Sequence, residues 1–321
     1  MDRGKVLKHC ATVCMVLAAM FFFSANGVAT AFQPDPSVVE KAPYRRIISL
    51  YGAHTENLLQ LGAVDQLIGV DGQAGELPGV DGKAVFSYHD DPERFLGARP
   101  DLVLIRPMIA RGYPRLVQRL TQSGIQVVSL QPATADQLAD YWLLLGRLVG
   151  HVDRAARMCD TFQATVDDFR RLSERVDTPK RVYFEAIHSK MKTFTPHAMA
   201  IFALETAGGI NVAADAPVRR NNNIAVYGKE RLLANADTID VFLSQQGAMN
   251  RVSVEAIMAE PGFSVINAVK SGSVYLVDET IVSRPTLGLL KGIYRIGCLL
   301  YPEIYCSAGQ AILASARLET K

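Results

Sequence analysis

The 321-residue sequence predicts an α/β fold with two doubly wound lobes, each built on a central parallel sheet, bridged by one long α-helix. Short strands that are apolar throughout alternate with amphipathic helices, the alternation occurs twice, and a single long helical stretch separates the two series. The composition, 49% hydrophobic and 21% charged, excludes disordered, collagen-like and coiled-coil proteins. A formal net charge of +2 gives no indication of a nucleic-acid partner.

The first 31 residues have the layout of a secretory signal peptide. Three basic residues precede an apolar run at 10–23, and small residues lead to Ala31. The run has about 14 residues, whereas a membrane span needs roughly 20. We therefore expect cleavage near Ala31 and a periplasmic or extracytoplasmic mature protein, with an uncleaved anchor as the alternative.

Three cysteines remain after the expected cleavage, namely Cys159, Cys298 and Cys306. An odd number leaves at least one thiol unpaired. Cys298 and Cys306 are close enough in sequence to form a disulfide, but the sequence does not show whether their geometry permits it.

A leader at 32–44 precedes the first lobe, which we place at 45–133. Its strands are short apolar runs rich in β-branched residues, and two of its helices end at Gly62 and Gly124. Strands are predicted at 46–50, 66–70, 101–105 and 126–130, and helices at 54–61, from 91 and at 113–123.

A helical linker at 134–177 follows, and the second lobe occupies 178–321. The linker holds a helix from Thr134 to about 148 and the bridging helix at 153–176, which is roughly 36 Å long. In the second lobe, strands are predicted at 181–187, 239–244 and 273–277, and helices at 199–207, 230–234, 254–259 and 286–300.

Four segments resemble the substrate-binding proteins of ABC importers for iron–siderophore, haem and cobalamin. They are the opening strand–helix–strand at 45–71, "DPERFLGARPDLVLI" at 91–105, "LETAGGINVA" at 204–213, and the closing segment at 269–303 with "VKSGSVYLVD" and "LLYPE". The resemblance implies two lobes bridged by one rigid helix, with a metal chelate bound between them. It also implies a monomer without a catalytic cofactor, which passes its cargo to the permease subunits of an ABC importer.

Ligands of open α/β sheets bind beyond the carboxyl ends of the strands, and this rule selects the candidate ligand-binding residues. Imidazole suits metal, haem or a cobalt centre, methionine offers a soft sulfur, and arginine grips carboxylate or phosphate. The candidates are Tyr51, His54, Tyr88, His89 and Arg106 in the first lobe, and His188, Met191, Gln246, Arg251 and Arg284 in the second.

The alternative cargo is a bare transition-metal ion, for which His54, His188 and His197 are the candidate ligands. A metal ion needs several side chains that converge on it, and spacing gives no support because these histidines lie on separate segments. Each also has an ordinary structural interpretation as a capping, buried or solvated residue.

The resemblance further implies that one exposed glutamate on each lobe docks into the permease. Glu93 and Glu230 occupy the corresponding segments. Both fall at predicted helix starts, where a carboxylate also favours the helix dipole.

An exported enzyme is a rival function, and we do not expect it. The sequence has no G-x-S-x-G or H-E-x-x-H motif. Glu185 and His188 are not expected to meet, because residues three apart on a strand point to opposite faces. Haem, a corrinoid, a siderophore and a bare ion remain open as cargo.

Overall fold

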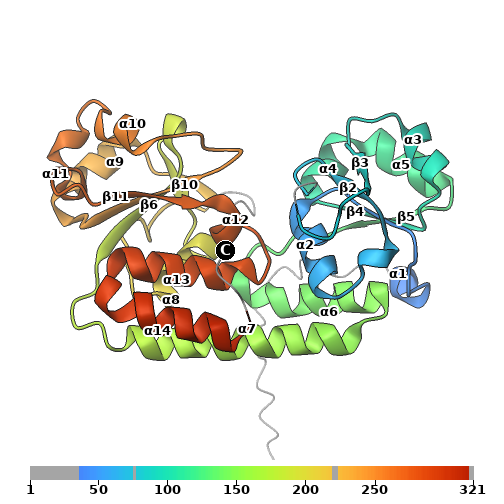
Figure 1. Ribbon diagram of the computed structural model, residues 1–321. Helices are drawn as coiled ribbons and strands as arrows, with labels where there is room; N and C mark the ends of the chain where they lie inside the picture. Colours follow the sequence, from blue (N-terminus) through green and yellow to red (C-terminus); the bar gives the residue numbers. More distant parts are fainter. Residues whose placement is uncertain (1–35, 75–76, 219–222, 318–321) are drawn as a thin grey trace, which may run out of the picture. The chain divides into compact units, whose positions relative to one another are not determined.

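The computed structural model of the chain describes residues 36–74, 77–218 and 223–317 (Figure 1). The expected signal peptide, its cleavage site near Ala31 and the first residues of the leader lie outside these ranges. None of the helices within them is long and apolar enough to cross a membrane.

The first sheet contains five parallel strands in the order β3-β2-β1-β4-β5. Every residue of the inner strands β1 and β4 is buried, which is why all of them except Ser49 are apolar. The edge strand β3 was not predicted, because two of its three residues are exposed. The strands are β1 Ile47–Ser49, β2 Leu67–Asp71, β3 Ala84–Phe86, β4 Leu102–Ile105 and β5 Gln126–Ser129.

Short helices precede β1 and follow β1, β3 and β4 of this sheet. Asp91 caps α3, since its Oδ1 accepts a hydrogen bond from the Glu93 N–H at 2.9 Å, and Pro92 occupies the first helical position. The helices are α1 Pro36–Glu40, α2 Gly52–Gln60, α3 Pro92–Ala98, α4 Pro107–Gly112 and α5 Pro114–Gln122.

Two helices connect the first sheet to the second. α6 (Leu138–Val149) ends at Gly150, whose φ of 76° favours glycine, and α7 (Val152–Ser173) follows at once. Trp142 of α6 is fully buried and packs edge to face on Phe162 of α7, with 5.2 Å between ring centroids. α7 contacts α6 and also α8, α13 and α14, so it is the predicted bridging helix and one core continues along it.

The second sheet has the order β11-β10-β6-β7-β9, with β8 paired to β6. β6, β10 and β11 are parallel, whereas β7 is antiparallel to both β6 and β9. The expectation of a parallel sheet is therefore corrected here: the chain reverses in the tight turn His188–Lys190 instead of crossing over through a helix. The strands are β6 Arg181–Ile187, β7 Lys192–Phe194, β8 Ile210–Asn211, β9 Ile224–Val226, β10 Val241–Gln246 and β11 Val274–Asp278.

Helices α13 and α14 close the described chain as an adjacent pair (Figure 1). The last predicted helix was 286–300, and α14 was not predicted, because Pro302, which ends one helix pattern, also stands in the first turn of the next helix. The helices of this half are α8 Met199–Thr206, α9 Lys229–Ala234, α10 Val254–Met258, α11 Asn267–Lys270, α12 Glu279–Val282, α13 Gly288–Leu300 and α14 Pro302–Ser315.

Candidate ligand-binding site

Tyr51 and Arg106 meet at the carboxyl edge of the first sheet. Tyr51 follows β1, Arg106 follows the neighbouring strand β4, and the guanidinium carbon lies 4.7 Å from the centre of the tyrosine ring. Burial raises the pKa of Tyr51, although the positive charges of Arg106 and Arg284 oppose that rise. The phenol is therefore neutral and stands beside cationic groups.

Arg284 joins this group from the other half of the chain. It follows α12, which begins directly after β11, and its Nη1 lies 3.1 Å from the place that a Cβ on Gly52 would occupy. Asp71 belongs to the same group: burial raises its pKa, whereas the N–H of Ala74 and the charge of Arg284 lower it. The structure thus brings together the predicted Tyr51, Arg106 and Arg284. It adds Asp71, the last residue of β2, which directly follows the strand predicted at 66–70 and which the strand-end rule could therefore have selected.

A second group at the first sheet is aromatic. Tyr88 and His89 follow β3, and their ring centroids are 4.4 Å apart. Tyr113, which the sequence analysis missed, lies 4.8 Å from Tyr88 and places its hydroxyl 3.0 Å from Nδ1 of His89. Together the three rings offer aromatic faces and an exposed imidazole.

His188 is held by a polar network at the end of β6. Its Nδ1 lies 3.0 Å from a carboxylate oxygen of the fully buried Glu185, which also accepts a hydrogen bond from the Ser244 hydroxyl at 2.8 Å. Asn250 accepts from the backbone N–H of His188 and donates to Ser244. The hydrogen bond to Glu185 raises the pKa of His188 more than burial lowers it.

The contact between Glu185 and His188 overturns the expectation that the two residues point to opposite faces. β6 ends at Ile187, and His188 is the first residue of a 3-10 turn, so strand alternation does not apply to it. The other ring nitrogen, Nε2, lies 3.8 Å from Glu260, beyond hydrogen-bonding distance. Nε2 is therefore the atom of His188 that a ligand would meet.

The remaining candidates of the second half are Met191 after the 3-10 turn, Gln246 at the end of β10 and Arg251 beyond β10. Met191 is partly buried and packs against the core of the second sheet. Gln246 is exposed and donates to the carbonyl of Val252 at 3.3 Å, and Arg251 is exposed as well. These three side chains are not part of the hydrogen-bond network of His188.

His54 has a packing role instead of the expected ligand role. It has no exposed surface, its Nδ1 lies 2.6 Å from the Tyr141 hydroxyl and its Nε2 lies 3.2 Å from the carbonyl of Ile105. A carbonyl only accepts, so Nε2 carries the proton and Nδ1 accepts from Tyr141. Burial lowers the pKa of His54 to about 4. We do not carry His54 into the ligand set.

His197 does not join His188. It is exposed and follows β7, the antiparallel strand that leads the chain away from the carboxyl edge of β6. Across the described ranges, no three His, Cys, Asp or Glu side chains are grouped so that they could hold a metal ion. The predicted set of His54, His188 and His197 is therefore not assembled.

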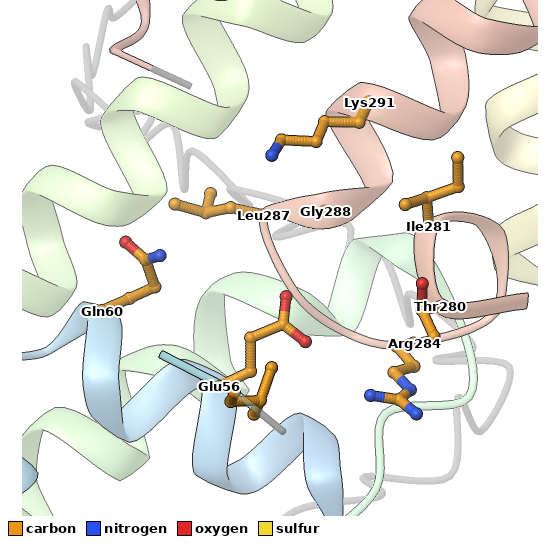
Figure 2. Close-up of a pocket in the computed structure, with 9 residues that line it drawn as sticks. Glu56, Gln60, Thr280, Ile281, Arg284, Leu287, Gly288 and Lys291 are labelled. Carbon is orange, nitrogen blue, oxygen red and sulfur yellow. The ribbon is translucent and has the colours of Figure 1, made fainter. Parts of the chain in front are cut away.

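A cavity of about 230 Å³ lies between α2 and the segment that joins α12 to α13. Glu56 and Lys291 direct their charged ends into it, and Arg284 stands at its margin (Figure 2). Burial raises the pKa of Glu56, while a hydrogen bond to Thr286 and the two cations oppose that rise. Nearby, the buried Asn57 donates to the carbonyl of Pro285 at 2.9 Å, which ties α2 to the same segment.

The two glutamates expected at the permease lie in first turns of short helices. Glu93 of α3 is 66% exposed and pairs with Arg119 at 2.7 Å. Glu230 of α9 is exposed too. Both side chains are accessible to a partner.

Residues 47–280 match the family described as periplasmic binding protein. The chain belongs to this family. This finding confirms the resemblance based on four segments, and the predicted α/β fold with a long bridging helix is that of the family's solved structures.

Two bacterial proteins are similar to this chain in sequence. One is an uncharacterized ABC transporter substrate-binding lipoprotein, YvrC, of Bacillus subtilis, 24% identical over 278 residues that cover 83% of each chain. The other is the vitamin B12-binding protein of Vibrio cholerae, 24% identical over 268 residues, which are 81% of this chain and 91% of that one.

Two solved structures are similar as well. A possible iron-binding, periplasmic solute-binding protein from Staphylococcus epidermidis is 25% identical, with a TM-score of 0.70 over 81% of this chain and 100% of its own. The periplasmic heme-binding protein HutB of Vibrio cholerae is 22% identical, with a TM-score of 0.69 over 80% of this chain and 99% of its own. At 22% identity, the similarity to HutB shows only that the two proteins share a fold.

Proposed function

We propose that the protein is an extracytoplasmic solute-binding protein that captures an iron- or cobalt-containing chelate (a siderophore, haem or corrinoid) and delivers it to an ABC importer. The observation that carries the proposal is the group of Tyr51 and Arg106, which follow strands of the first sheet, and Arg284, which comes from the other half of the chain. In this proposal the lobes are 45–133 and 178–321, and the cargo lies between them. The names of the relatives, vitamin B12-binding and iron-binding, support this class of cargo.

A chelate fits the site better than a bare metal ion. A chelate already contains most of the ligands of its metal. It therefore needs from the protein charged groups that bind it, aromatic contacts and at most one or two further metal ligands. Arg106 and Arg284 supply positive charges that bind carboxylate or phosphate groups. Tyr88 and Tyr113 supply aromatic faces, and His188 supplies a nitrogen ligand. A bare ion needs three or four converging ligands, and the described residues contain no such set.

Equilibrium binding to haemin, a ferric siderophore and cyanocobalamin tests the proposal, with zinc and nickel ions as the alternative. We expect one chelate to bind, and we expect Arg106→Ala, Arg284→Ala and His188→Ala each to weaken that binding about tenfold or more, equivalent to about 1.4 kcal/mol. Arg94→Ala is the matched control, because Arg94 is exposed and pairs with Asp90. Stoichiometric binding of a bare ion in the absence of any chelate binding would overturn the proposal.

We propose further that Glu93 and Glu230 dock on the permease. In cells with the cognate importer, alanine at either position is expected to reduce cargo uptake about tenfold while the Kd for cargo stays unchanged, because neither side chain lies in the ligand group. Glu303→Ala, at an exposed first-turn glutamate of α14, is the control and is expected to leave uptake intact. Uptake at the parental rate in the double variant would exclude this docking role.

A further inference from the structure

Two thiols face each other across the last helix pair of the described chain. Cys298 is in the final turn of α13, Cys306 is in the second turn of α14, and only Tyr301 separates the two helices. Cys298 is partly buried against the main core, and Cys306 is exposed. In a tight helical hairpin, residues placed in this way before and after the turn are neighbours.

The two helices approach closely because small residues meet aromatic rings at their interface. A Cβ on Gly297 would lie 2.1 Å from the ring of Tyr305, and a Cβ on Gly309 would lie 2.8 Å from the ring of Tyr294. Cys298 directly follows Gly297 and Cys306 directly follows Tyr305, so both cysteines lie next to this contact between the helices. The Tyr294 hydroxyl donates to the carbonyl of Cys306 at 3.3 Å and fixes this end of the pair.

The side chains of the two cysteines interact directly in this arrangement. The Cys306 and Tyr294 side chains are the neighbours that act on the thiol of Cys298. Burial, followed by the neighbouring Cys306, raises the pKa of Cys298 to about 12. Cys298 is therefore a poor first nucleophile, so the exposed Cys306 is the thiol that an oxidant meets.

We infer that Cys298 and Cys306 are a modification site: they are oxidised to an intramolecular disulfide that links α13 to α14 once the protein is exported. The oxidant is a protein disulfide of the exported thiol–disulfide oxidoreductase class. The inference rests on export, as in the proposed function, since disulfides persist in oxidising compartments.

The reaction is ordinary thiol–disulfide exchange. Cys306 loses its proton, and its sulfur attacks the oxidant's disulfide, so that a mixed disulfide forms and one oxidant sulfur leaves as a thiolate. Cys298 then loses its proton and attacks the Cys306 sulfur, which expels the second oxidant sulfur. The two released thiolates take up the two protons, so the oxidant is reduced to a dithiol as the pair is oxidised.

Cys159 provides an internal reference. It lies on α7, its thiol donates to the carbonyl of Ala139 at 3.7 Å, and burial raises its pKa to about 11. It is a free thiol in the structure, as are the other two. We expect it to remain reduced in the exported protein.

Thiol counting on the processed, exported full-length product tests the inference. The protein is denatured in N-ethylmaleimide with and without prior reduction, and the labels are counted by mass spectrometry. The parent should take one label without reduction and three after it, and Cys159→Ser should take none and two. Cys306→Ser should take two labels in both conditions. Three labels on the unreduced parent would overturn the inference.

A second measurement separates failure of the inference from failure of export. The purified, reduced protein is incubated with an oxidised glutathione buffer and an exported oxidoreductase, and the melting temperature is followed. Formation of the disulfide should raise Tm by about 4 °C in the parent and leave Cys306→Ser unchanged. If the pair stays reduced under these conditions, the inference fails whatever the location of the protein.

Discussion

Replacing Glu185 by alanine is expected to lower the free energy of unfolding by about 3 to 5 kcal/mol, because the change leaves buried polar partners without their acceptor. The Ser244 hydroxyl and Nδ1 of His188 both depend on the Glu185 carboxylate, which has no exposed surface. Urea denaturation of the parent and the variant at pH 7 measures the difference.

Two further variants make this test specific. Glu230→Ala removes an exposed carboxylate from the same half of the chain and is expected to change stability by less than about 0.5 kcal/mol. In a double-mutant cycle, Glu185→Ala and His188→Ala should be strongly non-additive because the two side chains are bonded to each other. Additive effects, or a loss below about 1 kcal/mol for Glu185→Ala, would contradict the network described here.

Acidification from pH 6.5 to pH 4 is expected to cost the protein about 3 kcal/mol through His54 alone. Burial lowers the pKa of His54 to about 4 in the folded state, whereas the unfolded chain takes up a proton near pH 6.5. The unfolded state therefore binds more protons in this window, and stability falls as the pH falls. His54→Gln should reduce the slope of unfolding free energy against pH by about 1.4 kcal/mol per unit.

His188 is the matched control because its effect has the opposite sign and a different window. Its pKa is raised in the folded state, so its contribution is complete below about pH 6.5 and is lost as the pH rises through the raised value. His188→Gln should therefore change the slope above pH 6.5, and His54→Gln should change it below. If the acid-side slope survives in His54→Gln, the buried, neutral imidazole is not its cause.

These two histidines also show what a sequence can and cannot reveal about a site. Both follow apolar strands, and the strand-end rule selects both as ligands. They differ in partners that are distant in the sequence. The hydroxyl of Tyr141, 87 residues along the chain, is bonded to the buried His54. Asn250 is bonded to the backbone of His188, and Ser244 is bonded to the Glu185 carboxylate that His188 contacts. Such partners become neighbours only through tertiary packing, so local pattern does not identify them.

The fold is easier to predict than the site for a similar reason. β1 and β4 are buried throughout, so their sequences, apolar except for Ser49, identify them directly as inner parallel strands. The antiparallel β7 has only three residues. It follows a turn in which Met191 takes a φ of 46°, and methionine does not favour this left-handed conformation, so the sequence does not predict the turn. Prediction failed where the strands were too short for an informative hydrophobic periodicity, at β3, β7, β8 and β9.

The burial of Trp142 has a spectroscopic consequence. The sequence contains a single tryptophan, and its fully buried indole packs on Phe162 between α6 and α7. Its emission therefore reports whether the bridging helix is packed and is not a direct probe of contact with cargo. The fluorescence of Trp142 can therefore be used to follow the unfolding of the protein.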